Sequence, residues 1–170
     1  MDIVHCIDNS YVAQCGVTIT SVCVNNVNEV ILFHILTTNL SIFNREMLKK
    51  IVDKYRQKII FYNVDEYLLN KCPLREGDHV SLATYFRILM PDILPKSLNK
   101  VLYLDCDLVV CKNIKRLWDT DISTHSLGAV YDGGTDDIRT YNRLKYDIRQ
   151  GYFNAGVLLV NLAYWREFHI

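Results

Sequence analysis

The stretch "KVLYLDCDLVV", residues 100–110, places Asp105 and Asp107 in the middle of an apolar run. The apolar residues on either side predict a strand that is buried in a sheet. An ionised carboxylate without a partner is costly to bury. We therefore expect the strand to end near these aspartates, so that both carboxylates reach the rim of the sheet.

Strand-length apolar runs and helix-length amphipathic runs alternate around this stretch. We expect a helix at 81–91 to bury Leu82, Phe86 and Leu89 and to end at Pro91, and a helix at 10–26 to be capped by Ser10. The remaining predicted elements are a helix at 42–57 and strands at 2–8, 30–38, 58–64, 100–110, 126–132 and 153–165, the last leading into a short helix. This order predicts one α/β domain over residues 1–170, with a mainly parallel, Rossmann-like sheet flanked by helices.

Composition narrows the classes of function. The 170 residues carry 19 basic and 19 acidic side chains, so there is no electrostatic reason to expect a nucleic-acid partner. No apolar run reaches the roughly 20 residues of a membrane span, and the first ten residues lack the basic region of a secretory signal. We expect a cytoplasmic protein, with peripheral contact at the inner membrane as an option. The six cysteines (6, 15, 23, 72, 106 and 111) include no C-x-x-C pair. Because Cys6, Cys106 and Cys111 lie in apolar surroundings, we expect buried free thiols.

Four aspartates fall where predicted strands finish: Asp8, Asp105, Asp107 and Asp132. Ligands of open parallel sheets bind beyond the carboxyl ends of the strands, so these acids predict one polar rim. Strand alternation would place Asp105 and Asp107 on one side and Cys106 on the other. Two like charges held together favour a divalent cation, Mg²⁺ or Mn²⁺, whose remaining ligands are often phosphate oxygens.

Two chemistries use such a pair of aspartates after a strand. In a haloacid-dehalogenase-type phosphatase the first aspartate is the nucleophile, but that motif closes the first strand of the domain, and here about a hundred residues precede it. The pair Asp136 and Asp137 has no strand leading into it and makes a poor second metal pair. The other chemistry is glycosyl transfer from a nucleotide sugar, in which the metal stabilises the diphosphate leaving group.

Several segments together resemble glycosyltransferase family 8, the family of bacterial lipopolysaccharide glucosyl- and galactosyltransferases and of glycogenin. They are "MDIVHCIDNSYV" (1–12), "HVSLATYFRILMPDIL" (79–94), "KVLYLDCDLVV" (100–110), "LWDTDI" (117–122) and "FNAGVLLVNLAYWR" (153–166). The resemblance implies the GT-A fold with a mixed sheet, Mn²⁺ (or Mg²⁺) dependence and transfer with retention of configuration. It implies UDP-glucose or UDP-galactose as donor and a saccharide or glycolipid acceptor, in lipopolysaccharide or cell-surface glycan synthesis.

The same resemblance assigns roles to individual residues. Asp105 and Asp107 become the metal ligands and, with Arg87 and Asn154, the residues of the reaction centre; Arg87 reaches the diphosphate or the donor sugar. The residues implied in donor binding are Asp8, Asn9, Ser10 and Tyr11 around uracil and ribose, Asp132 near the sugar hydroxyls, and Asn154, Ala155 and Gly156 as a wall of the sugar site. From composition alone, Arg87 could equally be a solvated helix charge. His5, His34, Trp118 and Trp165 are expected in the core, and His79, His125 and His169 receive no metal role.

The resemblance also implies that the domain is truncated at its C-terminal end relative to the family. Family members continue with a D-Q-D-type segment and a His-x-x-Gly-x-x-Lys-Pro-Trp-type segment, which supplies a third metal ligand. The alternative function is therefore a non-catalytic or incomplete nucleotide-sugar-binding domain. In either case we expect an exposed apolar patch where such a segment would dock.

Overall fold

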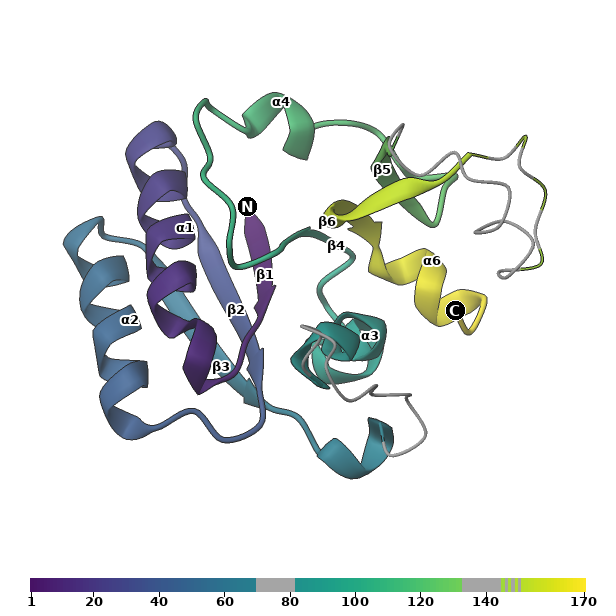
Figure 1. Cartoon of the computed structure of the whole chain (residues 1–170). Helices are drawn as coiled ribbons and strands as arrows, with labels where there is room; N and C mark the ends of the chain where they lie inside the picture. Colours follow the sequence, from purple (N-terminus) through teal and green to yellow (C-terminus); the bar gives the residue numbers. More distant parts are fainter. Residues whose placement is uncertain (70–81, 133–144, 146, 148, 150) are drawn as a thin grey trace.

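The structure of the chain, a computed structural model, describes residues 1–69, 82–132, 145, 147, 149 and 151–170. Strands and helices alternate in the order that the sequence predicts (Figure 1). The elements are β1 (Asp2–Cys6), the 3₁₀ helix η1 (Asn9–Tyr11), α1 (Val12–Asn25), β2 (Leu32–Thr37), α2 (Ile42–Lys54), β3 (Lys58–Asn63), η2 (Glu66–Leu69), η3 (Leu82–Leu89), α3 (Met90–Ile93), β4 (Lys100–Leu104), α4 (Lys115–Trp118), β5 (Leu127–Tyr131), β6 (Phe153–Asn161) and α6 (Leu162–Glu167).

The six strands form one mixed sheet in the order β3-β2-β1-β4-β6-β5. The first four are parallel, β6 runs antiparallel to β4, and β5 runs antiparallel to β6. The strand order turns back at β1, because β2 and β3 extend the sheet on one side and β4 on the other. Such a switch point leaves a crevice beyond the carboxyl ends of the two strands. Here those strands are β1 and β4, and β4 leads directly to Asp105.

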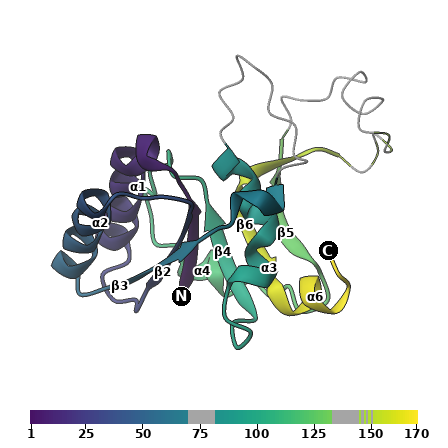
Figure 2. The same ribbon diagram turned by 90° about the horizontal axis from the view of Figure 1, so that it is seen from below.

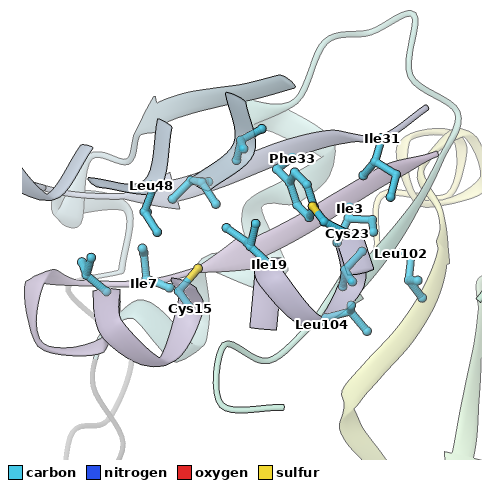
Figure 3. Close-up of a cluster of buried hydrophobic side chains, with 14 of the residues drawn as sticks. Ile3, Ile7, Cys15, Ile19, Cys23, Ile31, Phe33, Leu48, Leu102 and Leu104 are labelled. Carbon is cyan, nitrogen blue, oxygen red and sulfur yellow. The ribbon is translucent and has the colours of Figure 1, made fainter. Parts of the chain in front are cut away.

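Helices cover both faces of the sheet (Figure 2). On one face, α1 and α2 pack on β1, β2 and β4, and Figure 3 shows this apolar cluster around Ile3, Ile19 and Phe33. On the other face, η3, α3 and α6 pack on the same sheet through Phe86, Met90 and the buried Trp165 and its neighbours. Trp118 of α4 is only partly buried, at the border of the first cluster. Within the described residues, no helix has the length and apolarity needed to cross a membrane.

The start of the first helix differs from the prediction. Ser10 is not its cap: residues 9–11 form the 3₁₀ turn η1, and the Asp8 carboxylate caps that turn by accepting the Ser10 backbone N–H at 2.8 Å. α1 begins at Val12, directly after this turn. A carboxylate that caps a turn has a fixed orientation, so Asp8 is held at the end of β1.

The predicted helix at 81–91 is also only partly right, and Ser81 lies outside the described residues. Residues 82–89 form a 3₁₀ helix, whose period of three buries Ala83 and Phe86 fully and Leu82 and Leu89 only in part. Pro91 does not end this segment. It lies in the first turn of α3, where the missing backbone N–H of proline costs no hydrogen bond.

β4 ends at Leu104, and residues 105–107 leave the strand in a turn. Strand alternation therefore does not apply to Asp105 and Asp107, contrary to the prediction. Both nevertheless reach the rim of the sheet, together with Cys106, because the turn exposes all three to one hollow.

The prediction of buried thiols and imidazoles is right only in part. Five cysteines are free; Cys6, Cys15 and Cys23 are buried as expected, but Cys106 is only partly buried and Cys111 is exposed. Cys72 lies outside the described residues. Both ring nitrogens of His34 are hydrogen-bonded, to Asp2 at 3.0 Å and to Tyr62 at 2.9 Å. His5 is fully buried, but only its Nδ1 is bonded, and within the described part of the chain its Nε2 has no partner. The expectation of two satisfied core histidines is thus right for His34 and half right for His5.

Candidate donor-binding site

A hollow of about 190 Å³ lies beyond the carboxyl ends of β1 and β4. Three segments meet there: the end of β1 with η1, the middle of η3, and the turn after β4. The lining residues are Cys6, Ile7, Asp8, Tyr11, Ala83, Thr84, Arg87, Tyr103, Asp105, Cys106 and Asp107. Five of the residues that the sequence singles out therefore meet in one place, from three segments far apart in the chain.

Arg87 is held rigidly at the side of this hollow. Its guanidinium donates to the Thr84 carbonyl at 2.8 Å, to the Ala155 carbonyl at 2.6 Å and to Asp105 Oδ1 at 3.1 Å. Its Cζ also lies 4.5 Å from the centre of the Tyr103 ring, within the range of a cation–π contact. The side chain is only 16% exposed, so it is not the solvated helix charge that composition alone would allow.

Asp105 is fixed by contacts on several sides. Oδ1 accepts the Tyr103 hydroxyl at 2.6 Å as well as the Arg87 guanidinium. The Asp105 backbone N–H donates to the Gly156 carbonyl of β6 at 2.8 Å. A Cβ on Gly156 would lie 2.8 Å from Asp105 Oδ2, so only glycine permits this approach. The space beside Gly156 is therefore filled by the carboxylate of Asp105.

The charge of the hollow is negative. Three carboxylates, those of Asp8, Asp105 and Asp107, face one guanidinium, Arg87, which leaves a formal charge of −2. Asp107 is exposed and makes no hydrogen bond or ion pair within the described ranges. A divalent cation would balance this charge. Asp105 Oδ2, which accepts no hydrogen bond from the residues that the structure describes, and the carboxylate of Asp107 are oxygen donors of the kind that Mg²⁺ and Mn²⁺ prefer.

These oxygen donors fit a cation that is held partly by the protein and partly by the phosphate oxygens of a bound nucleotide. Among the described residues, no three histidine, cysteine or acidic side chains are grouped closely enough to hold an ion. Mg²⁺ is commonly held by one or two carboxylates, and phosphate oxygens then complete its coordination shell. Burial and the neighbouring aspartates raise the pKa of Cys106 to about 11, and burial also raises the pKa of Cys6. Both thiols therefore stay protonated at neutral pH when no metal is bound.

Some predicted donor-binding residues lie outside this hollow. Asn9 and Ser10 line a different surface, and Asn9 Oδ1 accepts the Ser41 backbone N–H and the Asn44 side chain, which ties η1 to the start of α2. Asp132 follows β5, where its backbone N–H donates to Tyr152. The group Asn154, Ala155 and Gly156 on β6 borders Asp105 and Arg87 without lining the hollow; Asn154 Oδ1 accepts the Gly156 N–H at 2.8 Å.

Other lining residues were missed by the sequence reasoning. The contact between Tyr103 and Asp105 could have been predicted. Residues 103 and 105 share a face in the strand that the sequence predicts, and a phenol can donate a hydrogen bond to a neighbouring carboxylate. Thr84 and Ala83 carry no such signal. Their position depends on the 3₁₀ turn of η3, which the helical periodicity does not reveal.

A second, larger concavity of about 870 Å³ lies between α1, α2 and the segment 109–111. No charged residue lines it, and Val17, Phe43 and Val109 within it are more than half exposed. We call it the α1–α2 groove. It is an exposed apolar surface, and the expected docking of a further segment on such a surface stays a prediction.

A mixed sheet with helices on both faces and a carboxylate-rich hollow at its switch point defines the GT-A class of nucleotide-sugar-dependent transferases. The sequence model of glycosyl transferase family 8 matches residues 2–170. The chain belongs to this family. The family match argues against a haloacid-dehalogenase-type phosphatase. The position of β4 does so too, because the aspartate motif of those phosphatases follows the first strand of the domain and here it follows the fourth.

Individual relatives resemble the chain in structure or in sequence. The galactosyltransferase LgtC, solved in complex with donor and acceptor sugar analogues, has a TM-score of 0.90 and 34% identity over 98% of this chain and 60% of its own. General stress protein A of Bacillus subtilis is 28% identical over 100% of this chain and 59% of its length. The lipopolysaccharide 1,3-galactosyltransferase of Salmonella typhimurium is 28% identical over 96% of this chain and 49% of its length. The chain thus spans about half to three-fifths of the length of these relatives.

Proposed function

We propose that this chain binds the donor of a retaining hexosyltransferase, which moves glucose or galactose from a UDP-sugar to a saccharide or glycolipid acceptor in lipopolysaccharide or cell-surface glycan synthesis. The observation that carries the proposal is the meeting of Asp8, Arg87, Asp105 and Asp107 in one hollow at the switch point of a family 8 fold. The negative charge of the hollow and its oxygen donors favour Mn²⁺ or Mg²⁺ with a nucleoside diphosphate.

In this proposal, Asp105 and Asp107 hold the cation, which when bound stabilises the negative charge of the leaving diphosphate. Tyr103 and Arg87 keep Asp105 in place through the contacts described above. Arg87 also brings a fixed, largely buried positive charge to the side of the hollow where the diphosphate oxygens would lie.

Other residues would surround the nucleoside and the sugar. Asp8 and Tyr11 border the uracil and ribose, with Asn9 and Ser10 behind them supporting η1 through the Asn9 contacts. Asn154, Ala155 and Gly156 lie on the β6 side, toward the donor sugar, and Asp132 near its hydroxyls. The relatives whose names specify galactosyl or glucosyl transfer support a hexose as the transferred group.

The direct test combines binding and turnover. Calorimetric titration of the 170-residue chain with UDP, with and without Mn²⁺, measures binding; release of UDP from UDP-glucose and UDP-galactose measures turnover. We expect UDP to bind more tightly with Mn²⁺ and ADP to bind weakly. UDP release would establish a transferase or hydrolase centre, and binding without release would support the alternative of a nucleotide-sugar-binding domain. Absence of both would contradict the proposal.

A further inference from the structure

β1 and β4 separate just before the hollow. As paired strands they share only two registers, Ile3 with Leu102 and Val4 with Tyr103. The next register along the two strands, His5 with Leu104, in which the Cys6 N–H would donate to Leu104, is not formed. The Leu104 carbonyl, the last of β4, would then lack a partner from β1. It is held by a side chain: His5 Nδ1 lies 2.8 Å from it.

This contact acts on the peptide unit that carries Asp105. The carbonyl of Leu104 and the N–H of Asp105 belong to the same planar peptide. His5 of β1 holds its carbonyl, and the Gly156 carbonyl of β6 accepts its N–H at 2.8 Å. The peptide is clamped from both neighbouring strands, and its orientation decides where the Asp105 carboxylate points.

The chemistry of His5 favours this role over simple packing. Its ring stacks on Phe33, with centroids 6.1 Å apart, in an apolar cluster that would accommodate another aromatic ring. Because a carbonyl only accepts, Nδ1 must carry the proton. Nε2 is then left as a buried acceptor without a partner in the described part of the chain, which is a cost that phenylalanine would avoid. The histidine is therefore useful at this position for its Nδ1–H.

We propose that His5 is a positioning residue of the donor site, whose Nδ1–H holds the Leu104–Asp105 peptide so that the Asp105 carboxylate stays beside Arg87 and can share a cation with Asp107. The role in donor binding rests on the proposed function. The clamp on the peptide does not, and the two are tested separately.

Three substitutions separate the hydrogen bond from the volume of the ring. His5→Asn keeps an N–H donor close to the place of Nδ1, His5→Gln moves the donor to the place of Nε2, and His5→Phe keeps the ring without a donor. His34→Phe is the matched control, because His34 is an equally buried, hydrogen-bonded histidine on the neighbouring strand whose partners are Asp2 and Tyr62.

The first readout needs no ligand: amide hydrogen exchange at Asp105, relative to the amides of β2. We expect exchange at Asp105 to be faster by about tenfold in His5→Phe and His5→Gln, since one hydrogen bond of typical net strength is lost, and to be near the parent value in His5→Asn and His34→Phe. Equal exchange in all four variants and the parent would overturn the proposal. If His5→Phe fails to fold, the comparison of His5→Asn with His5→Gln still decides the test.

The second readout is the Mn²⁺-dependent affinity for UDP. We expect the same ranking, with about a tenfold loss in His5→Phe and His5→Gln, recovery in His5→Asn and no change in His34→Phe despite its lower stability. If the parent chain binds no UDP while the exchange ranking holds, the proposed function fails and the clamp stands. If the parent binds UDP and His5→Phe binds it equally well, the clamp has no role in donor binding.

Discussion

The hollow at the end of β1 and β4 and the α1–α2 groove share two chain segments, those that follow β1 and β4, but have opposite chemistry. Asp8 and Tyr11 face the hollow, whereas Asn9 and Ser10, between them in sequence, face the groove. The hollow of about 190 Å³ carries four charged side chains, and the groove of about 870 Å³ carries none. The comparison teaches that strand ends and charge, rather than size, mark the candidate ligand site.

The largest expected effect on UDP affinity comes from a substitution in the hollow, at Asp107. Asp107→Asn removes one of the two proposed metal ligands without breaking a contact within the described residues, so folding should be unaffected. We expect the Mn²⁺-dependent affinity for UDP to fall by more than about a hundredfold, because even loss of a ligand's hydrogen-bond partner costs about 10- to 100-fold. Calorimetric titration measures the loss. The matched control is Asp53→Asn, an exposed carboxylate on α2, which should bind UDP as the parent does.

The pH dependence of stability should report the buried histidine beneath the hollow. Burial lowers the pKa of His5 from 6.5 to about 4 in the folded chain. Between these values the unfolded chain binds a proton that the folded chain does not. The free energy of unfolding is therefore highest above pH 6.5, as far as His5 is concerned, and falls as the pH drops toward 4.

The loss over this window is on the order of 3 kcal/mol, from about 1.4 kcal/mol per pH unit. Urea unfolding of the parent and of His5→Phe across pH 4 to 7 measures it. The decline should be shallower in His5→Phe by about that amount. Parallel curves for the two proteins would show that His5 does not titrate in this way.

A smaller effect is expected where β6 approaches the hollow. In Gly156→Ala the new Cβ would lie 2.8 Å from Asp105 Oδ2 and displace the carboxylate. We expect UDP affinity to fall by about tenfold, equivalent to roughly 1.4 kcal/mol. Gly128→Ala is the control, because a Cβ there meets only ordinary contacts at 3.6 Å and beyond. Equal affinities of the two variants would mean that Asp105 tolerates displacement.

The smallest effect belongs to the α1–α2 groove. Val17 is 56% exposed on α1, so Val17→Lys should change the free energy of unfolding by no more than about 0.5 kcal/mol. UDP affinity should stay within about twofold of the parent value. A tenfold loss measured in the same titration would show that the groove and the hollow are coupled and would remove the contrast drawn here.

The alternation of strands and helices and the position of Asp105 and Asp107 at a strand end could be predicted from the sequence, because apolar periodicity and charges at strand ends are local signals. The antiparallel β5 and β6 of the mixed sheet were implied only by the family resemblance, since no local pattern gives a strand's direction. The orientation of Asn9 toward α2 could not, because it depends on contacts with Ser41 and Asn44, far away in the chain.

Features set by the detailed backbone path were equally hidden. The 3₁₀ period of η3 and the place of Pro91 inside α3 are chosen by packing rather than by propensity. The clamp of His5 on Leu104 arises only because β1 and β4 separate, which no pattern in either strand shows. These are tertiary effects that override local sequence signals.

The most direct test of the central claim is a crystal structure of the chain grown with Mn²⁺ and UDP, with anomalous diffraction measured at the manganese edge. The account predicts an anomalous peak between the carboxylates of Asp105 and Asp107, in contact with diphosphate oxygens and next to Arg87. Nucleotide bound elsewhere, or the two carboxylates turned apart with no peak between them, would contradict it.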